Sequence, residues 1–502
     1  MGKNMVVQSV ILPNSICVEE EIYFRKKGEI HFIQDQIEMR AGSCLTTDTY
    51  MNCFDAAIWH QYTGITKWKV CMKVCGSGTV KLVQCSKEQR MVISEKSFQG
   101  QSPEIQQIPF EYDGGRCLYY LEFTAFSELK IINIRFEACA EQNQKNDIRL
   151  GLIICTYHRE KALSKNLNII RKSQFFNNAS ELYGKLQVFV IDNGSELPLL
   201  NEEFITLYHN PNTGGSGGFT RGIEEIRKQQ EKLQLSNVIF MDDDVEIIPE
   251  TLYRLYNLLA LIKDDYKNDV IAGRMFRMDQ RNIQYTAAEI WNKGDIRHIG
   301  WNRDMTLSEE LFQMNENQNA EYGGWWFCCY PISFVMENTP LPFFLHCDDV
   351  EYGLRHGGTP IILNGIQVWH ETYEYRQSPV IAYYDMRNPL IVNAIYGLLP
   401  DKKTVLAEWK KKISEAHVRK DYLTEKMMIQ GLFDYNKGIR WFFNVMSGKV
   451  HHNIGLTKKM ARIENAILWR ITEKITRHLY NKRKKQYREM YVFYLTGNEK
   501  KR

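Results

Sequence analysis

The sequence has few of the features that mark secreted, membrane-spanning or metal-cluster proteins. Its twelve cysteines, among 502 residues, form none of the paired CxxC motifs that bind structural zinc. No stretch reaches the ~20 consecutive apolar residues of a membrane span, and the nearest, residues 252–262, is interrupted by Arg254. The amino terminus also lacks the basic and apolar segments of a secretory signal. We therefore expect a soluble, cytoplasmic protein with reduced cysteines.

The charge is distributed unevenly along the chain. Hydrophobic residues make up 44% and charged residues 25%, which excludes a disordered chain, and the net charge is only +4. Residues 401–502, however, contain 25 Lys and Arg against 10 Asp and Glu. This excess predicts an anionic partner, either membrane phospholipid or nucleic acid. A solvated helical face with no partner is the alternative.

Residues 1–147 show the alternation of short strands. Residues 68–75 and 79–86 flank a Gly-Ser-Gly turn and predict one hairpin, and residues 117–126 and 129–139 predict a second. Period-2 alternation with few helix signals favours a β-sandwich. We expect the polar segment 140–147 to be the linker to the next domain.

Residues 148–395 alternate between apolar strands and helical stretches. The expected strands lie at 149–157, 186–194, 205–210 and 237–245. This order predicts an α/β domain whose mostly parallel sheet is covered on both faces. Ligands bind beyond the carboxyl ends of such strands, so the polar residues there are the first candidates for chemistry.

Residues 396–502 are predicted to form a basic helical domain. Within 460–495, the side chains of Ile467, Ile471 and Ile475 recur at helical spacing, with Lys and Arg between them. A basic amphipathic helix of this kind favours a membrane surface, and no recognisable nucleic-acid-binding module accompanies it.

Three consecutive carboxylates, Asp242, Asp243 and Asp244, end one of the predicted strands. Their mutual repulsion and desolvation are unfavourable unless a cation neutralises them. Alternate residues of an extended segment face the same side, so Asp242 and Asp244 can bind one Mg²⁺ or Mn²⁺. An acidic helix start before Pro249 is the simpler alternative.

A glycine-rich segment, residues 212–222, precedes a predicted helix. Its backbone N–H groups could approach a phosphate or a sugar. Thr220 stands where a GxGxxG dinucleotide fingerprint requires its third glycine, which argues against an oxidoreductase. A flexible connector remains the alternative.

Residues 343–370 contain a second acidic group and a histidine. Asp348, Asp349 and Glu351 stand at a predicted helix start, where the helix dipole favours acids, or where one of them acts as a general base. His370 ends a short apolar strand. Upstream, Trp325 and Trp326 follow two glycines and either stack on a sugar or anchor the core.

Taken in order, these segments resemble glycosyltransferase family 2, and within it the bacterial galactofuranosyltransferases that extend cell-wall galactan. The resemblance covers nearly the whole chain and implies a β-sandwich, a GT-A nucleotide-sugar domain and a helical tail. The elements that carry it are Thr156-Tyr-His-Arg159, Ile191-Asp192-Asn-Gly-Ser, Asn212-x-Gly-Gly-Ser-Gly-Gly, Asp242–Asp244, Gly-Gly-Trp325-Trp326, Asp348-Asp349-x-x-Tyr-Gly-Leu-Arg355 and Trp369-His370.

The resemblance also implies a role for each matching residue. The metal ligands would be Asp242, Asp244 and His370, and the base would be Asp349. Donor-binding residues would be Tyr157, Arg159, Asp192, Asn212, Gly214, Gly215, Asp243 and Trp326, and the acceptor would meet Trp325, Trp326 and Asp348. An inverting transfer needs such a base and a divalent ion, Mn²⁺ or Mg²⁺, on the departing diphosphate.

The implied reaction moves galactofuranose from UDP-galactofuranose to a lipid-linked glycan at the inner face of the cell membrane. Transfer of another sugar, such as rhamnose, is the first alternative. A non-catalytic glycan- or nucleotide-binding protein of the same fold is the second. Nucleic acid is not an expected partner, and a homo-oligomer is left open.

Overall fold

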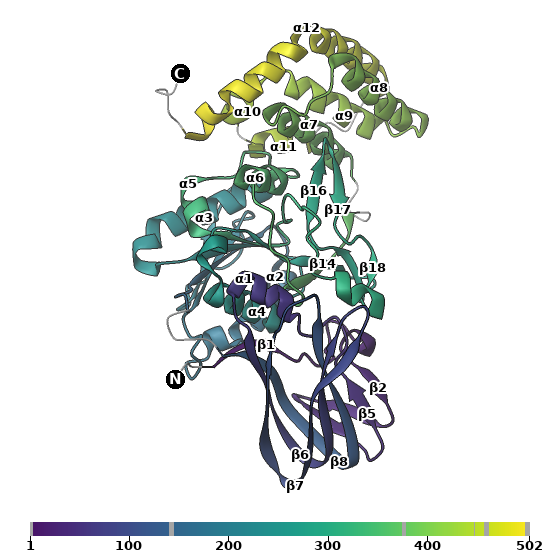
Figure 1. The fold of residues 1–502 in the computed structure, drawn as a ribbon. Helices are drawn as coiled ribbons and strands as arrows, with labels where there is room; N and C mark the ends of the chain where they lie inside the picture. The colour runs from purple at the N-terminus through teal and green to yellow at the C-terminus, as the bar shows by residue number, and fades with distance from the viewer. Residues whose placement is uncertain (1–3, 140–144, 374–377, 446, 456–460, 497–502) are drawn as a thin grey trace.

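The computed structural model describes residues 4–139, 145–373, 378–445, 447–455 and 461–496. Three regions follow one another along the molecule (Figure 1). The sheet-rich N-terminal region lies at one end, the mixed α/β region is central, and the C-terminal helices lie at the other end. Most of the linker expected at 140–147 falls outside the described residues. This arrangement agrees with the fold class predicted from the sequence.

Three long antiparallel strands dominate the N-terminal region: β6 (Lys67–Cys85), β7 (Arg90–Glu111) and β8 (Leu118–Ala138). Both expected hairpins are therefore wrong, because each predicted pair is one continuous strand. The Gly-Ser-Gly segment produces a bulge, where the β6–β8 register shifts between Gly76 and Gly78. Gly76 has φ +117°, and a Cβ there would lie 2.1 Å from the Glu128 carbonyl oxygen. The glycines thus bend a strand rather than reverse it.

The remaining N-terminal strands join the same hydrogen-bonded sheet of eight strands. They are β1 (Met5–Ser9), β2 (Arg25–Lys27), β3 (Ile30–Ile33), β4 (Gln36–Met39) and β5 (Cys44–Thr46). Helix α1 (Ala56–Thr63) follows them, capped by the Asp55 carboxylate, which accepts from the Ile58 N–H.

The central sheet has the order β11-β10-β9-β12-β19-β13, and its first four strands are parallel. The strands are β9 (Leu150–Thr156), β10 (Leu186–Asp192), β11 (Ile205–His209), β12 (Asn237–Asp242), β13 (Ile271–Ala272) and β19 (Phe327–Pro331). The associated helices are α2 (Glu160–Arg171), α3 (Gly214–Leu233), α4 (Pro249–Leu261), α5 (Ile332–Glu337) and α6 (Asp348–His356). Residues 156, 192 and 242 meet at one edge of this sheet, which is the edge predicted to carry the site.

A second, four-stranded sheet has the order β18-β15-β14-β20. It comprises β14 (Arg274–Arg277), β15 (Ile283–Thr286), β18 (Arg303–Asp304) and β20 (Gln367–His370), and a separate hairpin pairs β16 (Glu289–Asn292) with β17 (Asp295–His298). A bridge between Glu246 and Trp369 joins β20 to the segment after β12. This bridge brings His370 to the carboxyl end of the main sheet.

Six helices form the described C-terminal region. They are α7 (Pro379–Ile395), α8 (Lys402–Val418), α9 (Tyr422–Tyr435), α10 (Ile439–Asn444), α11 (Ser447–Gly455) and α12 (Ala461–Thr496). Helix α12 packs along the bundle through a polar and aromatic face that includes Asn465, Thr472, Thr476, Tyr480 and Tyr487. No helix in the described ranges is long and apolar enough to cross a bilayer.

Candidate functional site

Asp242, Asp244 and His370 form a compact cluster at the carboxyl end of β12. Each offers a ligand atom, and these atoms lie within 4.8 Å of one another. The His370 Nε2 atom is 3.2 Å from Asp244 Oδ1 and 3.6 Å from Asp242 Oδ2. Two carboxylate oxygens and one imidazole nitrogen are donors that suit Mn²⁺ or Mg²⁺. The cluster therefore fits a divalent ion.

Asp243 contacts Arg159 at the edge of this cluster. Its carboxylate is buried, and the Arg159 Nη1 group donates to Asp243 Oδ1 at 3.1 Å and lies 2.5 Å from Asp244 Oδ2. Burial, and next the Asp244 carboxylate, raise the pKa of Asp243. Arg159 stands at the start of α2, directly after β9, so this guanidinium joins two neighbouring strand ends.

Asp349, the predicted base, and its neighbour Asp348 form an acid pair at the start of α6. Burial raises the pKa of Asp348 to about 6. Burial also raises the pKa of Asp349, and the charges of Asp348, Glu289 and Asp242 add to the effect. Asp349 therefore lies within electrostatic reach of the group formed by Asp242, Asp244 and His370. It is also the more exposed of the pair, which leaves it accessible to a substrate hydroxyl.

The backbone before this pair is strained. Phe344, His346 and Cys347 all have φ between +62° and +78°, a region that side-chain-bearing residues rarely adopt. The Phe344 N–H donates to Ser216 Oγ at 2.9 Å, and Asn388 Nδ2 donates to the carbonyl oxygens of residues 345 and 346. Strain that the surroundings hold in place is typical of functional segments.

The glycine-rich segment packs directly against the strained backbone. Gly214 has φ +72°, and a Cβ there would lie 2.1 Å from the Phe344 carbonyl oxygen. A Cβ on Gly215 would lie 3.6 Å from Asp348 Oδ2. Asn212 Oδ1 accepts from the Gly214 N–H at 3.1 Å, which shapes the turn before α3. The glycines thus permit the close approach of this turn to the acid pair.

Tyr157 and Asp192 follow the neighbouring strands β9 and β10. Tyr157 is exposed and its ring contacts His158, so it is accessible to a ligand. Asp192 is buried, and its carboxylate accepts from the N–H groups of Gly194 and Leu197, both at 2.9 Å. In this conformation Asp192 shapes the loop after β10.

Trp325 and Trp326 belong to the core, so the expectation that their rings stack on a sugar is not met in this conformation. They are only 4% and 2% exposed. Trp325 makes edge-on contacts with the stacked rings of Phe219 and Phe240, and the Trp326 Nε1–H donates to the Gly273 carbonyl oxygen at 2.7 Å. The alternative of a core anchor describes both residues.

Glu289, on β16, is a further acidic residue near the site that the sequence did not predict. Its carboxylate is buried and lies 2.9 Å from His298 Nδ1, and its negative charge raises the pKa of Asp349. The His298 ring lies between Tyr285 and the exposed Trp301. Nothing in the local pattern Thr-Ala-Ala-Glu-Ile-Trp distinguishes Glu289 from a strand residue, and only the fold brings it to the acid pair.

Two family models match the chain. Residues 152–334 match Glycosyl transferase family 2, and residues 16–138 match Galactofuranosyltransferase 2 N-terminal. Together they cover the central sheet with its Asp cluster and most of the N-terminal sheet.

Two curated proteins are similar over most of the chain. Galactofuranosyltransferase GlfT2 of Mycobacterium tuberculosis is 23% identical over 451 residues, covering 82% of this chain and 68% of the relative. The protein of the same name from Mycolicibacterium smegmatis is 22% identical over 449 residues, covering 82% and 66%. The chain thus spans about two thirds of the length of these relatives.

Solved structures align with the N-terminal part at low similarity. The CBM22-1 xylan-binding domain from Paenibacillus barcinonensis Xyn10C covers 28% of this chain and 97% of its own length, with 8% identity and a TM-score of 0.20. This likeness is too weak to support an argument about fold or ligand.

Proposed function

We propose that this glycosyltransferase transfers galactofuranose from UDP-galactofuranose to a hydroxyl of a glycan acceptor, with inversion at the anomeric carbon. The chain joins a family 2 domain to a galactofuranosyltransferase-type N-terminal domain, and its curated relatives are named galactofuranosyltransferases. The observation that carries the proposal is the juxtaposition of two groups with different tasks. An acid with a raised pKa, Asp349, lies within electrostatic reach of the cluster Asp242–Asp244–His370.

The base is assigned to Asp349. In the proposed reaction its carboxylate takes the proton of the acceptor hydroxyl as the acceptor oxygen forms a bond to the anomeric carbon. The bond from that carbon to the diphosphate oxygen breaks on the opposite face, and UDP leaves with the bonding electrons. The raised pKa makes the carboxylate a stronger base than an exposed Asp, and the neighbouring acids maintain it.

Asp242, Asp244 and His370 are assigned as the ligands of a divalent ion, Mn²⁺ or Mg²⁺. When bound, such an ion neutralises the charge that develops on the departing diphosphate. Arg159 stands beside Asp243 and Asp244, where its guanidinium can also meet a phosphate. The turn at Gly214 and Gly215 lies next to the acid pair, which supports its assignment to the donor sugar.

The acceptor-binding site is assigned to the side of Asp349 that faces Glu289. The exposed ring of Trp301, stacked on His298, provides an aromatic surface there. Such a surface suits the C–H face of a sugar, and a carboxylate suits its hydroxyl groups. Trp301 replaces Trp325 and Trp326 in this role because their rings are buried.

Membrane binding is assigned to one face of α12. Ile467 and Ile471 are exposed on this helix, with Arg470 and Lys474 between and beyond them. An apolar stripe flanked by cations suits an anionic leaflet, where a lipid-linked acceptor would lie. We place the protein peripherally at the inner face of the cell membrane, and the domain boundaries near residues 147 and 395.

A donor screen tests the proposal. Purified protein with Mn²⁺ receives UDP-galactofuranose, UDP-galactopyranose or a rhamnose nucleotide, together with a galactan oligosaccharide, and nucleotide release is measured beside product mass. We expect release and a product one sugar longer with UDP-galactofuranose alone. Turnover only with the rhamnose nucleotide would transfer the assignment to that sugar. Tight donor binding without any turnover would indicate a binding protein.

A further inference from the structure

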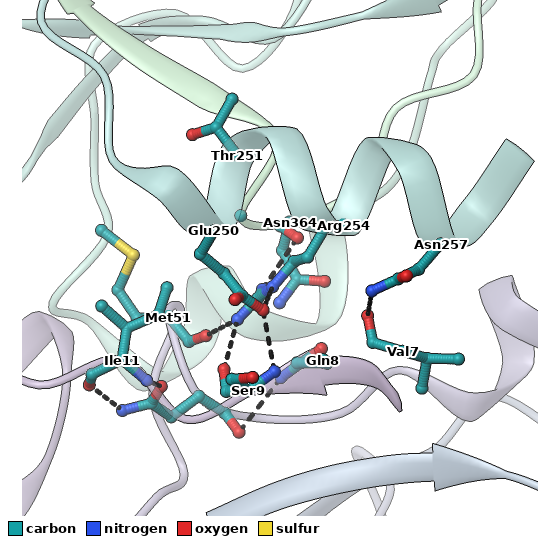
Figure 2. A network of polar contacts seen from close by, with 12 residues as sticks. Val7, Gln8, Ser9, Ile11, Met51, Glu250, Thr251, Arg254, Asn257 and Asn364 are labelled. Atoms are coloured by element: carbon teal, nitrogen blue, oxygen red, sulfur yellow. Dashed lines mark hydrogen bonds and ion pairs between the residues drawn. The ribbon is translucent and has the colours of Figure 1, made fainter. Parts of the chain in front are cut away.

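Helix α4 carries a buried ion pair that joins the N-terminal region to the central domain. Arg254 is fully buried, and its Nε–H donates to Glu250 Oε1 at 3.1 Å. Figure 2 shows that both Nη groups of the guanidinium reach backbone carbonyls of other segments. They donate to Met51 at 2.8 Å, Ser9 at 3.2 Å and Asn364 at 2.9 Å. One side chain thus binds both the N-terminal region and the segment before β20.

Tyr50, from the N-terminal region, holds the same segment. Its ring is fully buried, and its hydroxyl donates to Gln367 Oε1 at 2.6 Å. The Tyr50 carbonyl oxygen accepts from Asn364 Nδ2 at 3.1 Å. Helix α4 adds a further bond, because Thr251 Oγ1 donates to the Gln367 carbonyl oxygen at 2.8 Å. Residues 364–367 are therefore held from two sides.

The backbone at Gly365 packs closely against the Arg254 guanidinium. Gly365 has φ +82°, and a Cβ at this position would lie 2.1 Å from Arg254 Nη1. Any other residue would displace the guanidinium and the segment together. Gln367 begins β20, and His370 ends it three residues later.

The other half of the metal cluster is attached to the same helix. Glu246 lies two residues after Asp244 and three before Pro249, where α4 begins. The Glu246 N–H donates to the Trp369 carbonyl oxygen at 2.8 Å, and the Trp369 N–H donates back at 3.0 Å. Helix α4 is thus connected to the strand ends that carry Asp244 and His370.

We propose that the N-terminal region is a positioning element of the metal site, in which Tyr50, together with Arg254, holds residues 364–367 so that His370 keeps its spacing from Asp242 and Asp244. This inference rests on the proposed metal site. It gives the N-terminal region a task in catalysis that does not require it to touch the substrates. Residues behind a metal ligand commonly set its affinity for the ion in this way.

Mn²⁺ binding tests the proposal without using activity. Tyr50→Phe removes only the hydroxyl, and Gln367→Met removes its acceptor. Asn257→Ala is the matched control, since Asn257 lies one turn further along α4 and donates to the Val7 carbonyl oxygen at 3.5 Å across the same interface. Free Mn²⁺ is counted by electron paramagnetic resonance in a titration of each full-length variant. UDP binding in EDTA and the melting temperature are measured beside it.

We expect Tyr50→Phe to raise the Kd for Mn²⁺ by about 3- to 10-fold, with UDP binding in EDTA unchanged. Asn257→Ala should leave the Kd for Mn²⁺ at the wild-type value, even if it lowers the melting temperature by as much as Tyr50→Phe does. The double variant Tyr50→Phe/Gln367→Met should weaken Mn²⁺ binding by less than the two single effects combined, because both substitutions remove the Tyr50–Gln367 bond, although each also loses one bond of its own, from the Gly365 N–H to Tyr50 and from Gln367 Nε2 to Met51 Sδ. An unchanged Kd in Tyr50→Phe overturns the positioning role alone. Absence of Mn²⁺ binding by the wild-type protein overturns the metal site and this inference together.

Discussion

The acid pair at the start of α6 yields the prediction that the structure specifies most fully. In the wild-type protein, Asp349 Oδ1 accepts a hydrogen bond from the Val350 N–H at 2.7 Å. Asp349→Asn keeps the size of the side chain, and its amide oxygen can still accept this bond. An amide cannot take the acceptor proton at neutral pH. We therefore expect kcat to fall by about 10²- to 10⁴-fold, with donor affinity nearly unchanged.

The stability effect can be worked out for Asp348. Its pKa rises from the ordinary 3.8 to about 6 in the folded protein, chiefly through burial. The folded state thus binds this proton more tightly than the unfolded chain, so stability falls as the pH rises from about 4 to about 6. Two pKa units correspond to about 3 kcal/mol, a penalty that is fully present at pH 7.5.

Replacing Asp348 by Asn removes this penalty. With an unfolding entropy of ~2 cal/mol/K per residue, a protein of this length gains about 3 °C in melting temperature. The gain should appear at pH 7.5, shrink as the pH falls through about 6, and vanish below about pH 3, where the wild-type carboxyl is protonated in both states. Asp349→Asn should stabilise in the same direction, since it removes one of two repelling charges.

Calorimetry at a series of pH values and steady-state kinetics measure the two effects. Asp35→Asn is the matched control, because Asp35 lies exposed in the turn between β3 and β4. It should change neither quantity. The activity of the wild-type enzyme should also fall as the pH drops below the raised pKa of the pair. A near-normal kcat in Asp349→Asn would refute the base assignment, and an unchanged or lower melting temperature in both Asn variants would refute the electrostatic reasoning.

The remaining predictions concern the metal, the core and the tail. Asp244→Ala should abolish both Mn²⁺ binding and transfer while the protein stays folded, and full activity of this variant, or of the wild type in EDTA, would contradict the metal site. Trp326→Phe loses the hydrogen bond to the Gly273 carbonyl oxygen, so the free energy of unfolding measured in urea should fall by about 1–3 kcal/mol, with the KM for the donor unchanged. A raised KM without a loss of stability would restore a sugar-binding role for Trp326. Ile467→Ser/Ile471→Ser should weaken flotation with anionic liposomes several-fold, whereas Val418→Ser, at another exposed apolar position, should not. Equal flotation with neutral liposomes would contradict the membrane assignment.

The position of the site could be predicted from the sequence because it follows from strand order. Asp242 and Asp244 end an apolar strand within a βα alternation, and the carboxyl ends of parallel strands meet at one edge. His370 could be joined to them only through the resemblance. The Glu246–Trp369 bridge that places it links residues 123 positions apart, and no local pattern reports such a pair.

Other features depend on packing that a single sequence does not show. A tryptophan suits the core and a sugar equally well by composition, so Trp326 and the exposed Trp301 could not be told apart. The turn predicted at Gly76 is a bulge in the structure, because a glycine with positive φ suits a bulge in a long strand as well as a turn. The basic face expected on α12 is likewise reduced, since Arg483 donates to the Asn436 carbonyl oxygen and Lys484 to that of Leu399.

The boundaries near residues 147 and 395 suggest separable domains, but the buried charges cross both of them. At the first, Ser9 and Met51 of the N-terminal region complete the hydrogen bonds of Arg254 and Glu250 on α4. At the second, Tyr491 on α12 donates to the fully buried Glu351, which also pairs with Arg355 on α6.

Truncation would leave both ion pairs intact but remove neutral hydrogen-bond partners of these buried charges, which destabilises the protein by about 1–3 kcal/mol for each group left unsatisfied. Truncation at either boundary would therefore disturb α4 or α6, and with them the metal ligands or the acid pair. The site lies in the central domain, but its geometry depends on contacts from both ends of the chain. Point substitutions such as Tyr50→Phe test these contacts more cleanly than deletions, because they remove only the bonds of one hydroxyl, to Gln367 and Gly365, while the buried charges keep their partners.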